Sequence, residues 1–231
     1  TQELRLQDIS STDRFNWIVG LFYQKSYVRD QFAGSVPRAL DLINYGAALR
    51  DEPLTPSLTD IFGVELYQGE FFVAQRNEHH DRQFAAYAQA DYEIVPRVKL
   101  TAGARYTIAN YKFNGFTAGP LYSTEGRADT GDTTVRNLTP KFAASFQADK
   151  NNLFYVSASK GIRGPGVSPP VGARCADEAA AIGFDPYATL QLKPDSIWSY
   201  EIGSKNRLFG GKDAIDVSAY RIAWKNVQNM F

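Results

Sequence analysis

Two neighbouring strand-like segments joined by a short turn constrain the fold of this chain more than any other feature, and in the second of them apolar and polar or small residues alternate. Residues 84–94 and 98–108 flank a short turn at Pro96 and Arg97. Successive side chains of a strand point to opposite faces, so residues 98–108 predict one apolar and one polar face. Strands of about ten residues with this pattern are typical of outer-membrane β-barrels, which turn apolar residues to lipid and polar residues to a wet interior.

The same alternation marks further segments along the chain. We expect eight strands, at residues 1–9, 14–28, 84–94, 98–108, 136–148, 153–162, 196–208 and 214–228. A Gly-Gly-Lys-Asp turn at 210–213 predicts a hairpin between the last two strands. In the last strand the apolar phase changes between Ala219 and Tyr220, which indicates either a bulge or a change of environment near a rim.

Short and long connections alternate between these strands. Turns of about four residues, typical of barrel hairpins, alternate with the segments 29–77, 114–135 and 163–195. Compact domains rarely hold three loops longer than about 15 residues, whereas outer-membrane barrels place short turns in the periplasm and long loops outside. We therefore predict an all-β fold, an antiparallel transmembrane β-barrel represented by a partial barrel of about eight meandering strands. In the first loop we expect a helix at 38–50 and a hairpin arm at 64–74.

Composition excludes several classes of protein. Lys and Arg number 25 and Asp and Glu number 25, so the chain lacks the basic excess of a nucleic-acid binder. No run of 18 apolar residues predicts a transmembrane helix. The many aromatic residues are consistent with girdles at the two membrane interfaces. The lone Cys175 makes no intrachain disulfide, and we assign it no role.

Five segments in order resemble TonB-dependent outer-membrane receptors of the α-proteobacterial type. They are TQELRL at 1–6, AGARY at 102–106, LTPK at 138–141, YVSASKGIR at 155–163 and LKPDSIWSYEIGSK at 192–205. Ile162 stands where the family usually has Phe. The resemblance implies energised uptake of a scarce ligand, most commonly a ferric siderophore or another iron complex. Because the sequence contains no recognisable plug or TonB box, we expect residues 1–231 to be part of the barrel domain of a longer chain.

The resemblance also implies partners and sites. The partners would be the TonB complex acting through a plug domain, the ligand and outer-membrane lipid, with no cofactor. Ligand contacts are expected at the extracellular mouth, from Lys160, Arg163, Tyr122, Phe116 and Tyr187; a rim salt bridge is the alternative for the two cations. The inward charges are expected to form a salt-bridged lumen wall that faces the plug: Lys99, Arg105, Lys141, Glu201, Lys205 and Arg207.

Enzymatic and metal sites are not expected. The sequence has no Gly-x-Ser-x-Gly, His-Glu-x-x-His or phosphate-binding loop. His79 and His80 are adjacent in an extended segment, so their side chains should diverge to opposite faces rather than converge on one metal.

Two alternative architectures stay open from the sequence. A self-contained eight-stranded outer-membrane barrel with a structural or adhesive role would require the first strand to pair with the eighth. A soluble β-sandwich binding module would need short loops at both ends and polar outward faces. The apolar rows within residues 15–23 and 98–108, if turned to water, would favour aggregation.

Overall fold

The computed structural model describes residues 1–8, 14–35, 38–63, 65–120, 122–168, 175–185 and 190–228. In these residues eight antiparallel strands form one sheet, in the order β1-β2-β3-β4-β5-β6-β9-β10. The strands are β1 (Gln2–Gln7), β2 (Phe15–Ser35), β3 (Phe71–Val95), β4 (Val98–Gly119), β5 (Ser123–Gln147), β6 (Asn152–Arg163), β9 (Asp195–Leu208) and β10 (Asp213–Lys225).

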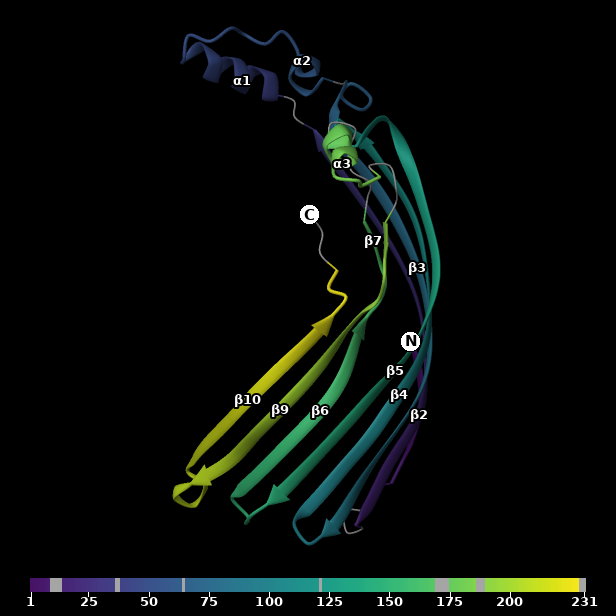
Figure 1. Cartoon of the computed structure of the whole chain (residues 1–231), viewed down its shortest axis with the longest axis vertical. Helices are drawn as coiled ribbons and strands as arrows, with labels where there is room; N and C mark the ends of the chain where they lie inside the picture. The colour runs from purple at the N-terminus through teal and green to yellow at the C-terminus, as the bar shows by residue number, and fades with distance from the viewer. Residues whose placement is uncertain are drawn as a thin grey trace.

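The sheet is a single curved layer, open on its concave side (Figure 1). In the part of the chain described, β1 and β10 are its two edges, and the pairing between first and last strands that a closed eight-stranded barrel needs is not formed. The predicted all-β fold, a partial barrel of about eight meandering strands, is confirmed. The layered packing of two large sheets that a β-sandwich needs is not what the described residues form.

Large apolar side chains lie on the outside of the sheet rather than in a core. Register places Leu21, Ala86, Tyr106 and Leu138 in one row across four strands. Leu21, Tyr106 and Leu138 are 47%, 45% and 53% exposed. Apart from Pro120, the apolar side chains buried among the described residues all belong to alanines. Such a surface is stable only when an apolar medium covers it, as lipid covers the outward band of a membrane barrel.

The first long strands extend much further than the alternation predicts. β2 continues to Ser35, β3 begins at Phe71, β4 runs to Gly119 and β5 begins at Ser123. The boundaries predicted for the loop at 114–135 were therefore wrong, because β4 and β5 remain paired from their lower ends to Thr117 opposite Arg127. Above the apolar band polar residues occur on both faces, so the strands stay paired although the sequence no longer alternates between apolar and polar residues.

The change of phase in β10 arises from a change of environment, not from a bulge. β10 pairs with β9 without a register shift from Asp213 opposite Leu208 to Lys225 opposite Ser196. Ile215 and Val217 therefore lie on the outer face with Ile202, whereas Tyr220, Ile222 and Trp224 lie on the inner face.

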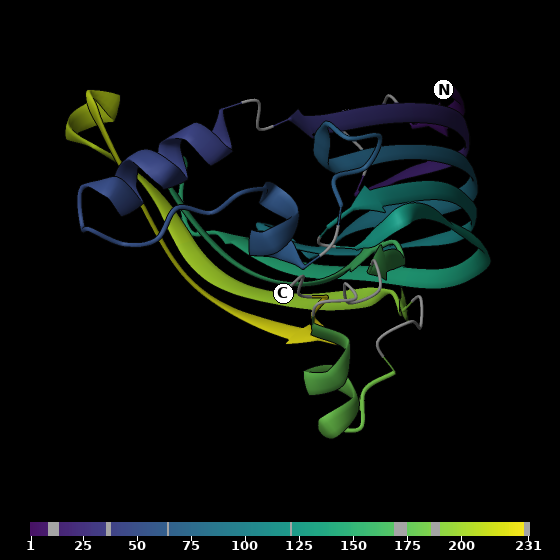
Figure 2. The same cartoon turned by 90° about the horizontal axis from the view of Figure 1, so that it is seen from above.

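The connecting segments carry the helices. In the first loop, α1 (Ala39–Ala48) confirms the helix expected at 38–50, and α2 (Leu58–Phe62), capped by the Ser57 side chain, was not predicted. Instead of an arm at 64–74, a tight turn with a bridge between Tyr67 and Phe71 leads into β3. Seen from above, α1 and α2 lie over the open side of the curve (Figure 2). No described helix is long and apolar enough to cross a membrane.

The loop between β6 and β9 carries a small hairpin and a helix. β7 (Gly166–Ser168) pairs with β8 (Leu190–Leu192), and α3 (Ala176–Ala181) lies between them in sequence. At the other end of the sheet, the 3₁₀ turn η2 (Phe209–Gly211) closes the predicted β9–β10 hairpin, with Gly210 and Gly211 in the left-handed region.

Tyrosines cover glycines on the inner face of the sheet. Gly203 lies opposite Tyr155, and a Cβ added there would lie 2.7 Å from the Tyr155 ring. The Tyr155 hydroxyl then donates to the Glu201 carboxylate. Glycine at 203 thus leaves room for a ring that lies along the wall, a close approach of the kind that favours glycine inside a strand.

Candidate functional site

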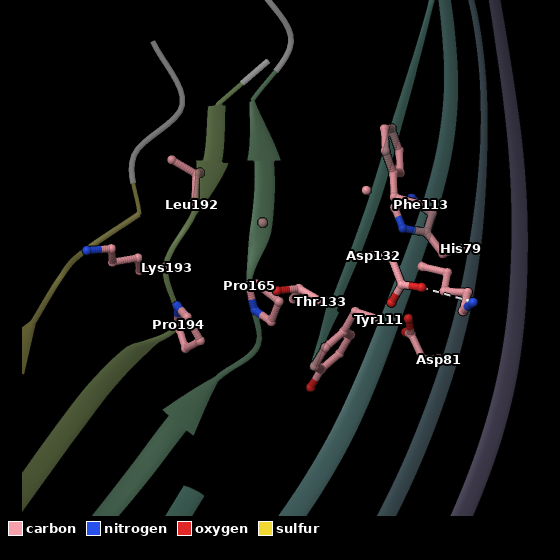
Figure 3. Close-up of a pocket in the computed structure, with 13 residues that line it drawn as sticks. His79, Asp81, Tyr111, Phe113, Asp132, Thr133, Pro165, Leu192, Lys193 and Pro194 are labelled. Atoms are coloured by element: carbon pink, nitrogen blue, oxygen red, sulfur yellow. Dashed lines mark ion pairs between the residues drawn. The ribbon is translucent and has the colours of Figure 1, made fainter. Parts of the chain in front are cut away.

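A cavity of about 420 Å³ lies on the concave side of the sheet, above the level of the outward apolar rows. One wall is formed by β3, β4 and β5, mainly by inward residues such as His79, Tyr111 and Thr133. Lys112 and Asp132, which the register places on the outer face, also line it. The opposite wall is formed by the two ends of the β6–β9 loop, which contribute Pro165, Gly166, Leu192, Lys193 and Pro194. Figure 3 shows Tyr111 and Thr133 pointing from the strands toward Pro165.

The strand wall presents aromatic and polar groups because the period of two continues above the apolar band. In β4 the inward positions are Thr107, Ala109, Tyr111 and Phe113, which share the face of Arg105. The His79 ring lies 5.0 Å from the Phe113 ring, centroid to centroid. This wall therefore offers both stacking surface and hydrogen-bonding groups to a ligand of moderate size.

The two neighbouring histidines lie on opposite faces of β3. His79 faces inward, with its Nε2 atom 4.0 Å from Oδ1 of Asp30, and Asn77 donates to Asp30 at 2.9 Å. His80 faces outward, its ring 4.6 Å from that of Tyr27. Among the described residues no group of three His, Cys, Asp or Glu side chains is placed to hold a metal ion.

Tyr111 is the central residue of the strand wall. It lies opposite Asp81 in the register, and burial, together with the Asp81 charge, raises the pKa of its phenol. The hydroxyl therefore stays protonated and is able both to donate and to accept a hydrogen bond. Gly164 approaches so closely that an added Cβ would lie 2.9 Å from the Tyr111 ring, so a glycine is needed where the loop passes this wall.

A cluster that we call the rim latch, made of Arg163, Asp195, Trp224 and Gln228, fixes the ends of the β6–β9 loop. Arg163 donates to the Asp195 carboxylate and to the backbone carbonyl of Gln228, the latter at 3.2 Å, and its guanidinium lies 5.6 Å from the Trp224 ring centroid. The Gln228 amide donates to the carbonyls of Gly164 and Lys193, each at 2.9 Å. The latch thus joins the two chain segments that form the loop wall of the cavity.

Asp195 is the buried member of the latch, with 1% of its surface exposed. Burial by itself would raise the pKa of this carboxyl, but hydrogen bonds from Arg163, from the Trp224 indole and from the Gln228 backbone hold the pKa below its ordinary value. The carboxylate is therefore charged at neutral pH and holds three donors at once.

The structure separates the residues expected at the mouth. Arg163 faces inward beside the cavity, but in the rim salt bridge that was the alternative for it. Lys160 lies on the outer face of β6, opposite Trp198, and Phe116 packs near Tyr67 with ring centroids 5.9 Å apart. Tyr122 lies in the β4–β5 turn, where its N–H donates to Gly119, and Tyr187 lies outside the described residues. None of the four described residues lines the cavity.

The six charges expected on the lumen wall lie on the inner face together. They are Lys99, Arg105, Lys141, Glu201, Lys205 and Arg207. The expected salt bridges are not formed within the described residues, because none of the six has an ion-pair partner within 4.0 Å there. Arg105 stacks on Phe22 at 4.6 Å, and Glu201 accepts from Tyr155, so rings and hydroxyls take the place of opposite charges.

The sequence analysis did not predict the residues that form the cavity. Tyr111 and Phe113 would have been found by extending the alternation of 98–108 by five residues, because they continue its polar phase. The role of Gln228 has no signal in the sequence, since it depends on the chain folding back over the ends of β6 and β9.

A family match and a comparison with one solved structure agree with this architecture. A family model described as "TonB dependent receptor-like, beta-barrel" matches residues 3–230. The structure is similar to that of the ferric yersiniabactin uptake receptor FyuA from Yersinia pestis, with a TM-score of 0.67 and 12% identity, over 98% of this chain and 28% of that chain. It also matches FpvA from P. aeruginosa, solved with a pyoverdine–iron complex, at a TM-score of 0.40 and 11% identity, over 95% of this chain and 32% of that one.

Proposed function

Because this chain belongs to the family of TonB-dependent receptor-like β-barrels, we propose that it forms a sector of an outer-membrane receptor for a ferric siderophore or another iron complex. The family consists of receptors and transporters rather than enzymes, and its barrels lie in the outer membrane. The chain spans about a quarter of the length of FyuA, at 28%, so uptake is a property that we propose for the complete receptor.

The observation that carries this proposal is the position of the cavity. It opens on the inner, polar side of a sheet whose outer side is apolar, and it lies toward the end that carries the long loops. A ligand arriving from outside would meet the aromatic groups of His79, Tyr111 and Phe113 on one wall. Lys193 on the other wall supplies a cation for an anionic chelate. Recognition by rings and a few placed polar groups needs no covalent chemistry.

The proposal includes the energy source and the partner. Transport would be driven by the TonB complex acting through a plug domain, and the inner-face residues Lys99, Arg105, Lys141, Glu201, Lys205 and Arg207 would face that plug. Arg105 stacks on the Phe22 ring and has no ion-pair partner within 4.0 Å among the described residues. Its guanidinium would therefore be able to donate hydrogen bonds to a plug. A domain inside the barrel is able to bind such donors and to release them without breaking internal ion pairs.

The test is ligand uptake by the complete receptor. We would express it in a Gram-negative host that lacks its own siderophore receptors and measure accumulation of radiolabelled iron from a panel of ferric siderophores and haem, in hosts with and without TonB. We expect uptake of at least one iron complex, abolished without TonB. Uptake of none of them, with the receptor folded in the outer membrane, would contradict the proposed ligand class; uptake that persists without TonB would contradict the proposed energy source.

A further inference from the structure

The outer face of the long strands changes character directly above the apolar band. The last apolar row contains Tyr23, Phe84 and Ile108, with Arg136 at its end. The next row contains Lys25, Arg82, Asn110 and Thr134, and the one after it contains Tyr27, His80, Lys112 and Asp132. A band of cations thus begins where an outward apolar surface ends.

Lys25 and Arg82 lie directly opposite each other on neighbouring strands. Like charges in this position repel each other, so the pair destabilises the sheet unless an anion lies between them. Both side chains are exposed, and no described carboxylate lies within 4.0 Å of Lys25, Arg82 or Arg136. The nearby Asp132 is already held by Lys112 at 2.9 Å and by Asn110 at 2.8 Å.

The cations also share a hollow of the surface. A groove of about 580 Å³ is lined by Lys25, Arg82 and Lys112, together with the ring of His80 and the amides of Asn110 and Asn114. Two carboxylates also line the groove: Asp132, which Lys112 pairs at 2.9 Å, and Asp81, which lies on the inner face. Three cations stand against these two carboxylates, and Lys25 and Arg82 are the cations without an ion-pair partner among the described residues. Such a groove is suited to an anion with several acceptor oxygens.

The charge is specific to this face of the strands. On the inner face of the β2–β5 wall from Asp81 upward, the charged residues in register are acidic, Asp81, Asp30 and Asp129, apart from Arg127 near the hairpin. The chain as a whole has zero formal charge. The excess of cations on the outside is therefore a local arrangement of the upper β2–β5 wall and does not reflect a basic chain.

We propose that these outward cations, which we call the rim cation cluster (Lys25, Arg82, Lys112 and Arg136), bind the phosphate groups of lipopolysaccharide in the outer leaflet. The inference rests on the proposed function in one respect, because it requires the sheet to cross the outer membrane with its long loops outside. The apolar rows then lie among acyl chains, and the first cationic rows lie at the level of the phosphorylated headgroups. The phosphates supply the counter-charge that the facing Lys25 and Arg82 lack.

The test compares two matched pairs of substitutions in the complete receptor. Lys25→Gln with Arg82→Gln removes two charges from the cluster, and Lys150→Gln with Lys212→Gln removes two charges from the turns at the opposite end of the sheet. Binding of lipopolysaccharide would be measured on the purified receptors in neutral detergent, alongside the same preparation treated with phosphatase. A cation at an anionic membrane surface contributes about fivefold, so the cluster variant should bind roughly 30-fold more weakly.

The outcomes separate this inference from the proposed function. We expect the control pair to bind like the unsubstituted receptor, and phosphatase treatment to abolish the difference between the variants. Equal binding by the two pairs, undiminished binding of the dephosphorylated lipid, or complete competition by inorganic phosphate at the same phosphate concentration would overturn the proposal. Failure of the proposed function would appear instead as absence of the folded receptor from the outer membrane or of iron uptake, neither of which depends on this binding assay.

Discussion

The two halves of the sheet end differently at the upper rim. β2, β3, β4 and β5 are 21–25 residues long and continue as a wall above the apolar band. β6, β9 and β10 are 12–14 residues long and stop near the rim, where the rim latch and the β6–β9 loop begin. The cavity lies between the long strands β3, β4 and β5 and the loop that begins where the shorter β6 ends. The difference in strand length therefore creates the site.

The comparison also separates two sources of stability. In the apolar band, lipid selects the outward residue at every second position, and one face is fixed by the medium. Above the band, where polar residues occur on both faces, the sheet is stabilised by backbone pairing and by specific contacts such as the rim latch. Substitutions should therefore have large effects on the outward face below the rim and local effects above it.

The largest effect is expected for a charge placed on the outward face of the band. Val19→Arg would put a guanidinium among acyl chains, which costs about 2–4 kcal/mol near the middle of a bilayer. Asn114→Arg places the same group on the same face above the band, where we expect little change. Unfolding of the complete receptor in lipid vesicles by denaturant measures both. Equal destabilisation by the two variants would remove the boundary that we place above Ile108.

A smaller and local effect is expected from breaking the rim latch. Asp195→Ala removes the acceptor of Arg163, the Trp224 indole and the Gln228 backbone, and hydrogen bonds to a charged group contribute about 1.5–3 kcal/mol. We expect faster proteolysis within the β6–β9 loop and weaker ligand binding, with the β2–β5 wall unaffected. Arg163→Ala should have a similar effect, and the double variant should cost less than the sum of the two. Strict additivity would show that the two residues act separately.

The width of the cavity offers a more limited test. Gly164→Leu would push a side chain against the Tyr111 ring, and because overpacking costs about 1–3 kcal/mol, ligand affinity should fall by roughly tenfold. Gly161→Leu is the matched control, because an added Cβ there meets no atom within 4 Å. The measurement is a titration of the complete receptor and of both variants with the iron complex that the receptor takes up. Similar losses for both variants would place the ligand away from this cavity.

The smallest effect is a pH dependence of the latch. Since the pKa of Asp195 is lowered in the folded state, its stabilisation is fully present above the unfolded value of about 3.9 and is lost as pH falls through the lower folded value. A fluorotryptophan NMR signal from Trp224 should be constant from pH 5 to 8 and should shift below about pH 4. In Asp195→Asn this shift should be absent, and its persistence there would assign it to another group.

What the sequence predicts well is the part that lipid determines. The alternation in 98–108 gave the strand, both of its faces and the inward position of Lys99 and Arg105, because each outward residue in the band must be apolar. Above Ile108 that requirement ends, and residues such as Asn110, Lys112 and Asn114 resemble a polar loop although they are paired in β4. For this reason the expected loop at 114–135 proved to be mostly strand.

The candidate site was harder to predict for two further reasons. Asp195 and Arg163 come together only through the pairing of β6 with β9, and their neighbour Gln228 arrives from beyond the end of β10. Lys160 was expected beside Arg163, but the period of two turns it to the outer face. A prediction from the motif alone places such residues at the right height along the strand without placing them on the right face.

The most direct test of the account is a nitroxide scan along β4 in the complete receptor in bilayers. Each position from Val98 to Gly119 would be replaced in turn by a spin-labelled cysteine, in a Cys175→Ser background, and its accessibility to oxygen and to a water-soluble relaxation agent would be measured. We predict a period of two, with oxygen favoured at even-numbered positions, that ends near Ile108 and gives way to water accessibility on both faces. Alternation that continues unchanged to Gly119, or that is missing from 98–108, would contradict the account.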